Sequence, residues 1–138
     1  MAQGAQFATA QMTLRTLDTS VIMAVLLGEH GQEVAARVAP GSVLSSVNFA
    51  EIITKCIEKA VPPEIAERYI RESDIEIVGF DTDLAILAGD VFKRAKKGVL
   101  SLGDRACIAT AIQRGTTVIT ADRVWAELDL PCKVELIR

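Results

Sequence analysis

The chain has 138 residues, half of them hydrophobic, and its 18 acidic and 15 basic residues give a formal net charge of −3. This length favours one domain, and the negative balance provides no global basic field that would attract nucleic acid. The three cysteines form no CxxC pair, and their odd number argues against a disulfide framework, so we predict a cytoplasmic protein.

The beginning of the chain has a different character from the rest. Residues 1–12 show no apolar periodicity and precede the first predicted strand, so we interpret them as a loose N-terminal extension to a domain at 13–138. They lack the cationic start and the apolar core of a signal peptide. The longest purely apolar run, 21–27, is far shorter than the ~20 residues that a bilayer requires, so we expect no membrane association.

Predicted strands and helices alternate along the rest of the chain. In chain order they are a strand at 14–17, helices at 21–27 and 32–38, a strand at 42–45, helices at 47–59 and 64–72, a strand at 75–78, helices at 81–97 and 104–114, a strand at 117–120, a short helix at 124–128 and a strand at 133–136. Strands separated by helices indicate right-handed βαβ units. The fold class is therefore α/β with a mainly parallel sheet.

Four carboxylates stand at corresponding places in this pattern. Asp18 and Asp122 follow predicted strands directly, and Glu51 and Asp104 lie in the first turn of predicted helices. In a parallel sheet the carboxyl ends of the strands and the starts of the following helices share one edge, where ligands usually bind. We therefore expect the four side chains to lie close together.

Carboxylates gathered in this way repel one another. At a separation of ~5 Å and an effective dielectric constant of about 20, each pair costs roughly 3 kcal/mol. A chain that keeps such a cluster charged needs a cation. Oxygen ligands without neighbouring cysteine or histidine suit Mg²⁺ or Mn²⁺ better than zinc, so these acids are predicted to bind one of those ions.

Each acid also has a purely structural explanation. Asp18 and Asp122 could cap the helices that follow them, while Glu51 and Asp104 have capping-box spacing to Asn48 and Ser101. Taken together these explanations weaken, because all four acids fall at the same predicted edge beside small hydroxyl residues. Capping and metal binding are also compatible, since a helix N-terminus keeps a carboxylate ionised.

Other charged residues are assigned more simply. Asp81 and Asp83 are expected to cap a helix, and the basic run 93–97 complements the dipole at a helix C-terminus. Arg105 and Arg123, each next to a candidate acid, are better placed for contact with phosphate or a partner. His30, the only histidine, is expected in an exposed loop, which disfavours a His-based zinc site or a Ser-His-Asp triad.

The ordered motifs resemble those of PIN domains, and specifically those of VapC-type toxins from bacterial and archaeal toxin–antitoxin pairs. The resemblance runs from about residue 14 to 136 and is carried by the stretches 17–22, 46–51, 101–111 and 118–122. It implies a three-layer α/β/α sandwich and a Mg²⁺- or Mn²⁺-dependent endoribonuclease. Its site residues would be Asp18, Glu51, Asp104 and Asp122, supported by Ser20 and Thr120.

The same resemblance implies partners: an RNA substrate, a second copy of the chain in a homodimer, and a small antitoxin whose tail wraps the toxin. The high hydrophobic content agrees, because it suggests an apolar face left for a partner. Two alternatives remain open. One is a catalytically silent PIN-like binding module, and the other is a Mg²⁺-binding receiver-type signalling domain, which would require an adjacent acidic pair after the first strand and a late lysine.

Overall fold

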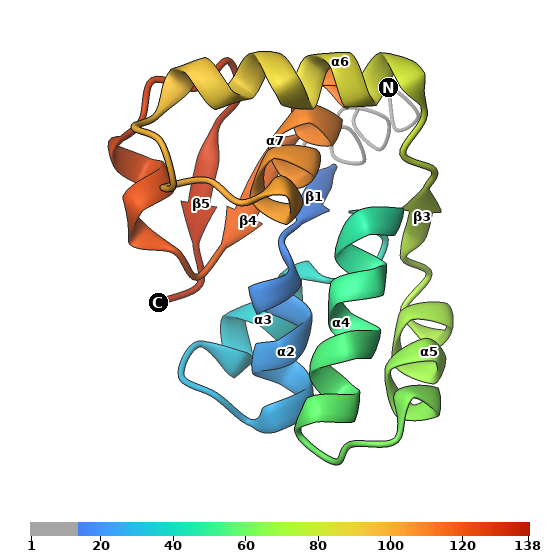
Figure 1. Cartoon of the computed structure of the whole chain (residues 1–138). Helices are drawn as coiled ribbons and strands as arrows, with labels where there is room; N and C mark the ends of the chain where they lie inside the picture. The colour runs from blue at the N-terminus through green and yellow to red at the C-terminus, as the bar shows by residue number, and fades with distance from the viewer. Residues whose placement is uncertain (1–13) are drawn as a thin grey trace, which may run out of the picture.

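The computed structural model describes residues 14–138 and contains one parallel sheet flanked by helices (Figure 1). In this part of the chain the sheet has five strands in the order β3-β2-β1-β4-β5. All neighbouring strands run parallel. The strands are β1 (Arg15–Leu17), β2 (Val43–Ser45), β3 (Glu76–Val78), β4 (Thr117–Thr120) and β5 (Val134–Leu136). The predicted extension, 1–12, lies outside the described residues.

The helices connect these strands and cover both faces of the sheet. They are α2 (Thr19–Leu27), α3 (Gln32–Val38), α4 (Ser46–Glu58), α5 (Pro63–Glu72), α6 (Thr82–Val91) and α7 (Leu102–Arg114), with short 3-10 helices η1 (Phe92–Arg94) and η2 (Arg123–Glu127). No helix within 14–138 has the length and apolar character needed to span a bilayer.

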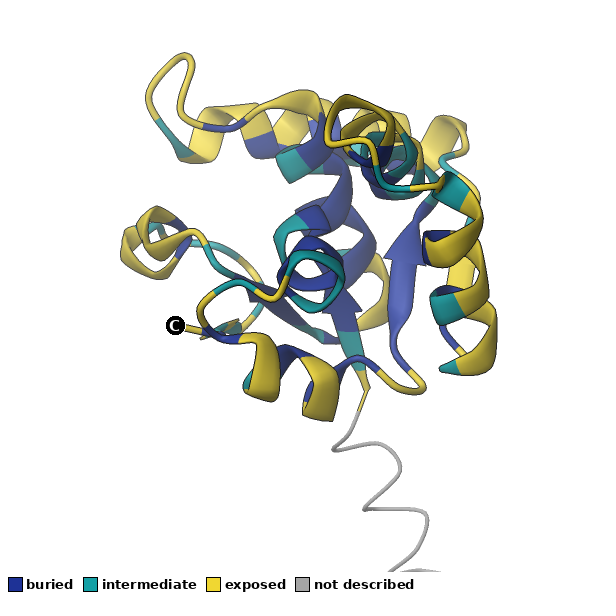
Figure 2. Ribbon diagram, turned by 90° about the horizontal axis from the view of Figure 1, so that it is seen from below, coloured by how far each residue is buried: buried dark blue, intermediate teal, exposed yellow. Residues whose placement is uncertain are grey.

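Two apolar layers hold the sandwich together because side chains alternate across a strand. Ile119 faces a core that it shares with buried residues of α2 to α5, and its neighbour Val118 faces a second core under α7 and η2. A smaller cluster joins α6 to α7. Figure 2 shows the result, with buried strands and helix faces inside and exposed helix faces outside. The predicted three-layer α/β/α sandwich is confirmed.

The sheet order also decides one alternative. The receiver-type domain belongs to the doubly wound folds with strand order 2-1-3-4-5, whereas the order here is 3-2-1-4-5. This alternative was therefore wrong. In the observed order the topology reverses between β1 and β4, which makes the carboxyl ends of these two strands the expected ligand-binding position.

Most predicted elements are present, and the main correction concerns the helix expected at 81–97. It ends as an α-helix at Val91, tightens into η1, and gives way to extended backbone at Ala95. Like charges at neighbouring helical positions in the basic run disfavour continuation. The guanidinium of Arg94, the last residue of η1, donates to the carbonyl oxygen of Asp129 at 3.3 Å.

Candidate active site

The four predicted acids line one pocket of about 500 Å³ at the reversal point of the sheet. Asp18 follows β1, Asp122 follows β4, Glu51 belongs to α4, and Asp104 belongs to α7. Four elements that are distant in sequence thus bring their carboxylates to one edge. The sequence-based expectation that the four side chains lie together agrees with this placement.

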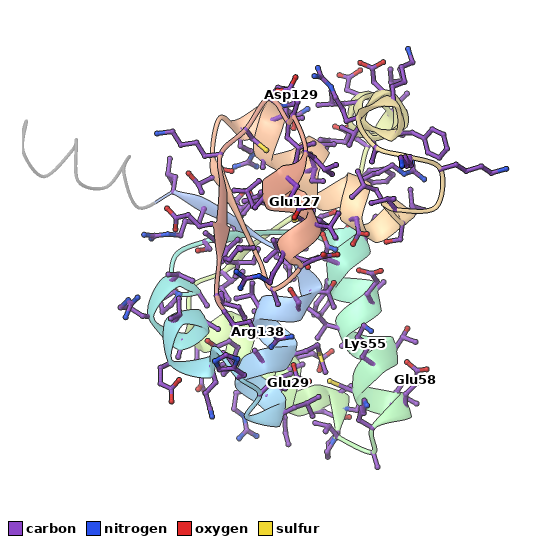
Figure 3. All side chains as sticks on the ribbon, turned by 90° about the vertical axis from the view of Figure 1, so that its left-hand side faces the viewer. Glu29, Lys55, Glu58, Glu127, Asp129 and Arg138 are labelled. Carbon is purple, nitrogen blue, oxygen red and sulfur yellow. The ribbon has the colours of Figure 1, made fainter. Side chains whose placement is uncertain are left out.

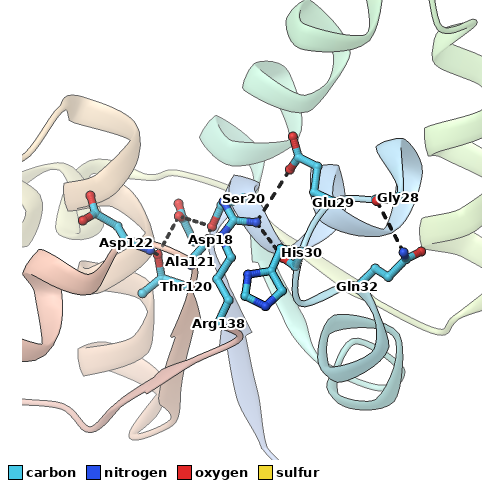
Figure 4. Close-up of polar contacts among 10 residues, drawn as sticks. All are labelled: Asp18, Ser20, Gly28, Glu29, His30, Gln32, Thr120, Ala121, Asp122 and Arg138. Atoms are coloured by element: carbon cyan, nitrogen blue, oxygen red, sulfur yellow. Dashed lines mark hydrogen bonds and ion pairs between the residues drawn. The ribbon is translucent and has the colours of Figure 1, made fainter.

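Asp18 forms the buried floor of the pocket, with only 6% of its surface exposed. Its backbone N–H extends the pairing of β1 with β4 by donating to the Ile119 carbonyl oxygen at 2.9 Å. Its side chain does not cap α2. Instead Oδ2 accepts hydrogen bonds from the Ser20 hydroxyl at 2.7 Å and the Thr120 hydroxyl at 2.9 Å (Figure 4).

The two hydroxyls also bind the end of β4. Ser20 Oγ accepts from the Ala121 N–H at 3.0 Å, and Thr120 Oγ1 accepts from the Asp122 N–H at 3.0 Å. Each hydroxyl therefore donates to Asp18 and accepts from the chain that leads to Asp122. This network fixes Asp18 and Asp122 relative to each other. Such a contribution is the one expected of Ser20 and Thr120 as supporting residues.

The surroundings of Asp18 make its ionised form less favourable than it is in water. Burial raises the pKa of Asp18 from its usual 3.8 to about 6, against the opposing effect of the two hydroxyls. The negative charges of Asp104 and Glu51 contribute to this increase. Burial is likewise the main reason that the pKa of Asp104 is raised, with smaller contributions from Glu51 and Asp122. The negative charges of the acids therefore affect the pKa values of Asp18 and Asp104 across the pocket.

Glu51 is held by two side chains rather than by a helix cap. Its Oε1 accepts from the Thr19 hydroxyl at 2.7 Å and from Asn48 Nδ2 at 3.0 Å. The helix cap predicted at Asn48 was wrong: Ser45 is the N-cap of α4, and its hydroxyl accepts from the Val47 N–H. Asn48 lies one turn further on, fully buried.

Asn48 connects three elements of the site. Its Nδ2 also bonds Thr19 Oγ1 at 3.2 Å and the carbonyl oxygen of Gly103 at 3.1 Å. Its Oδ1 is buried without a hydrogen-bond partner within 14–138, and an unsatisfied buried acceptor costs about 1–3 kcal/mol. A position retained at this cost is well explained by the need to hold Glu51 beside α7.

Asp104 and Asp122 do cap helices, as the structural explanation predicted. Ser101 and Asp104 form a complete capping box, in which Asp104 Oδ2 accepts from the Ser101 N–H at 2.9 Å. Asp122 Oδ1 accepts from the Val124 N–H at 3.0 Å. Each cap occupies one oxygen and leaves the other free. Capping therefore positions these carboxylates without consuming them.

The same division holds for all four acids. Within residues 14–138 no hydrogen bond reaches the second oxygen of any of them, namely Asp18 Oδ1, Glu51 Oε2, Asp104 Oδ1 and Asp122 Oδ2. No group of three acidic, histidine or cysteine side chains in this region is drawn together as a finished metal cage. The donor set nevertheless fits a hard divalent cation, since four carboxylates each retain a free oxygen and two have raised pKa values.

The remaining candidates lie around the pocket. Arg105 packs against α6, where its guanidinium donates to the Ala88 carbonyl oxygen at 3.2 Å and lies over the Phe92 ring. Arg123 donates to the carbonyl oxygen of Arg138 at 2.8 Å. Neither lines the pocket. His30 is exposed in a loop, as expected, and Asp81 caps α6 through the Leu84 N–H.

Gly103 is a site residue that the sequence motif contains but does not explain. A Cβ at this position would overlap the carboxylate of Glu51, both its oxygens and its Cδ. The close approach of α7 to Glu51 thus requires the absence of a side chain. Only the tertiary packing of α4 on α7 reveals this requirement.

This contact leads to a prediction for Gly103→Ala. The new methyl group should expel the Glu51 carboxylate from its bonds to Thr19 and Asn48 and destabilise the fold by about 1–3 kcal/mol, as overpacking typically does. Thermal unfolding measures the loss. Gly89→Ala is the matched control, because a Cβ there meets nothing within 4 Å and alanine favours helix. Equal stability of the two variants would contradict the packing argument.

The fold is an α/β sandwich, and its acidic pocket lies where the order of the sheet reverses. Four separate elements contribute the carboxylates of this pocket, and these features together define the class of protein. The chain belongs to the PIN domain family, whose model matches residues 16–130. Within that family it is similar to Ribonuclease VapC42 of Mycobacterium tuberculosis and VapC ribonuclease Mb2780c of Mycobacterium bovis. Each is 28% identical over 114 residues, which cover 75% of this chain and 86% of the relative.

Solved structures have the same fold. VapBC2 from Rickettsia felis, bound to a promoter DNA fragment, matches with a TM-score of 0.67 at 17% identity, over 89% of this chain and 98% of that one. VapBC-5 from Mycobacterium tuberculosis, a member of the VapBC family of toxin-antitoxin systems, matches with a TM-score of 0.55 at 26% identity, over 91% and 98%. The predicted resemblance to VapC-like PIN domains is confirmed.

Proposed function

We propose that this protein is a divalent-metal-dependent endoribonuclease, with Mg²⁺ or Mn²⁺ as the ion, and the toxin of a toxin–antitoxin pair that acts in the cytoplasm. The observation that carries the proposal is that Asp18, Glu51, Asp104 and Asp122 line one pocket, each with a free carboxylate oxygen. The ribonuclease names of its relatives support the same activity. Residues 13–138 would form the nuclease domain.

In this proposal the four acids are the metal-binding residues. A divalent cation held there would supply positive charge to the scissile phosphate and lower the pKa of a water molecule at the site. The chain's own contribution is position and charge. Ser20 and Thr120 fix Asp18 at the floor, Thr19 and Asn48 fix Glu51 at the wall, and the caps fix Asp104 and Asp122 at the rim.

Attack on the phosphodiester also requires that a proton be accepted near the rim. Asp122 is exposed, Asp104 and Glu51 are partly buried, and Asp18 is buried. Glu51 is in addition held by Thr19 and Asn48. We therefore assign Asp18 and Glu51 to holding the cation, and Asp104 and Asp122 to contact with both the cation and the attacking water. The only histidine lies outside the pocket lining, so this route uses carboxylates alone.

Cleavage of RNA tests the proposal directly. The purified full chain should cut a set of single-stranded and hairpin RNAs in Mg²⁺ or Mn²⁺, and chelation with EDTA should stop the reaction. Gel mapping of end-labelled products measures the cuts. Internal cuts would establish an endonuclease. Cleavage that persists in EDTA and disappears in His30→Ala would overturn the assignment.

A protein partner is the second part of the proposal. The structural relatives are toxin–antitoxin complexes by name, and this chain retains exposed apolar side chains at Ile57, Ile86 and Leu102, which are 65%, 68% and 52% exposed. Exposed apolar surface favours contacts with other chains where it forms a contiguous patch. We propose a homodimer and an antitoxin that together cover it. Light scattering of the free toxin at micromolar concentration should give the mass of a dimer.

A further inference from the structure

The acidic pocket also contains cations, and two of them belong to α4 and its C-cap, the helix that carries Glu51. Lys55 and Lys59 line the pocket together with the four acids. Glu51, Lys55 and Lys59 are spaced by four residues, and Lys59 is the C-cap of α4, where its N–H still donates to the Lys55 carbonyl oxygen at 3.0 Å. The three residues therefore follow one face of the helix to its end. In Figure 3 Lys55 projects from α4, with Glu29 and Arg138 to its left.

Neither lysine has an ion-pair partner among residues 14–138. A glutamate four residues before a lysine normally forms an ion pair on a helix, and Glu51 precedes Lys55 in this way. Here Glu51 is turned away to Thr19 and Asn48. Among the described residues no carboxylate lies within 4 Å of Lys55 or Lys59.

The third cation of the pocket lining, Arg138, is in a different situation. Its guanidinium donates to the His30 carbonyl oxygen at 2.7 Å and lies 3.9 Å from a Glu29 oxygen (Figure 4). Arg138 therefore closes the loop after α2 against the C-terminus. The two lysines are the cations of this pocket that remain available to a ligand.

We propose that Lys55 and Lys59 bind phosphates of the RNA strand on one side of the scissile bond. Rising 1.5 Å per residue, α4 separates Glu51, Lys55 and Lys59 by about 6 Å each, which is comparable with the spacing of successive phosphates in an extended strand. The scissile phosphate would lie at Glu51, the next phosphate at Lys55 and the following one at Lys59. This inference rests on the proposed ribonuclease function and adds the direction and footprint of the substrate.

The assignment also resolves an electrostatic difficulty. RNA is an anion, and a pocket with four carboxylates in a chain of net charge −3 repels it. Exposed ammonium groups beside the acids offset this repulsion where the strand must pass. Cations near a helix C-terminus also complement the helix dipole, but the dipole does not require that both lysines face the pocket. The denser basic run at 93–97 lies outside the pocket lining.

Binding measurements separate these two groups of lysines. The test pair is Lys55→Ala with Lys59→Ala, and the matched control is Lys96→Ala with Lys97→Ala, which removes the same charge from exposed positions outside the pocket. Affinity for a fluorescein-labelled single-stranded RNA is followed by anisotropy in an Asp104→Asn background, which prevents cleavage. We expect the slope of log K against log salt to fall by about 0.7 for each pocket lysine and to stay unchanged in the control.

Cleavage kinetics and a modified substrate locate the contact. Both pocket variants should raise KM several-fold with little change in kcat, because the lysines that they remove bind the strand away from the reacting phosphate. An RNA with a neutral methylphosphonate next to the cut should bind the wild type more weakly, and Lys55→Ala should then cause no further loss. When the methylphosphonate lies one phosphate further from the cut, the wild type should again bind more weakly, and Lys59→Ala should cause no further loss.

The outcomes distinguish this inference from the function on which it rests. Metal-dependent cleavage by the wild type, together with pocket variants that bind and cut RNA like the control pair, would overturn the lysine assignment alone. Equal salt slopes for the pocket and control variants would have the same meaning. Absence of metal-dependent cleavage by the wild type would instead overturn the ribonuclease proposal.

Discussion

Asp18→Asn should reduce RNA cleavage by about a thousandfold, which corresponds to ~4 kcal/mol of transition-state stabilisation at 1.36 kcal/mol for each factor of ten. The reason is that Asn removes a negative charge from the floor of the pocket, where the charge on a bound cation must be balanced. The substitution keeps an acceptor oxygen for Ser20 and Thr120. Initial rates with an RNA cut by the wild type measure the change.

The same variant should be more stable than the wild type when metal is removed. The native-state pKa of Asp18 is about 6 against its usual 3.8, so protonation is easier in the folded than in the unfolded protein. Its contribution to stability is complete below pH 4 and is lost as the pH rises through 6. In EDTA at pH 7.5 the ionised Asp18 therefore destabilises the wild type by roughly 3 kcal/mol, and Asn removes this penalty.

Thermal unfolding in EDTA and in Mg²⁺, at pH 5 and pH 7.5, tests the prediction. The wild type should gain stability at pH 5, or when Mg²⁺ is added at pH 7.5, and Asp18→Asn should respond less to both. Asp81→Asn is the matched control, because Asp81 caps α6 outside the pocket lining. An Asp18→Asn protein that is inactive and less stable in EDTA would show that Asp18 serves the fold and not a cation.

The positions of the acids were accessible from sequence because they depend on local rules. Parallel strands end at one edge, so Asp18 and Asp122 were expected at the same edge once their strands were recognised. Their adjacency depends on the pairing of β1 with β4. The capping box of Ser101 and Asp104 follows from spacing alone. The bond from the Ser101 N–H to the Asp104 side chain therefore needed no knowledge of the rest of the chain.

Asn48 shows why the other part of the site was not accessible. Its spacing to Glu51 resembles a capping box, yet it bonds the Glu51 side chain directly, and its other partners, Thr19 and Gly103, lie 29 and 55 residues away. Gly103 is explained only by the carboxylate that occupies the space above it. Both roles arise from the packing of α2, α4 and α7, and no local pattern encodes that packing.

The density of charge along the sequence does not identify the cations that line the pocket. The run at 93–97 is the densest group of cations in the sequence and attracts attention for that reason. Lys55 and Lys59 are inconspicuous, because single cations near a helix end are common. Their place beside the acids depends on the orientation of α4, and their lack of a carboxylate partner depends on where Glu51 points.

Asp104→Asn should weaken binding of the proposed antitoxin about 30-fold or more. This loss of affinity is equivalent to ~2 kcal/mol, the lower end of the range for breaking a buried charge pair. An inhibitor of an acidic pocket is expected to insert Arg or Lys, so that its cation replaces the metal among the carboxylates. Asp104 suits this contact, because it is only partly buried and its Oδ1 is free. The asparagine oxygen can still accept from the Ser101 N–H, so α7 should keep its cap.

Titration calorimetry with the cognate antitoxin decides the matter, again with Asp81→Asn as the control. Competition between the antitoxin and Mg²⁺ provides a second test. If the antitoxin and Mg²⁺ occupy the same carboxylates, Mg²⁺ must weaken antitoxin binding to the wild type by the factor with which the antitoxin weakens Mg²⁺ binding. Asp104→Asn should lose much of this competition together with its affinity. Unchanged affinity and no effect of Mg²⁺ would mean that the partner covers apolar surface and leaves the pocket open.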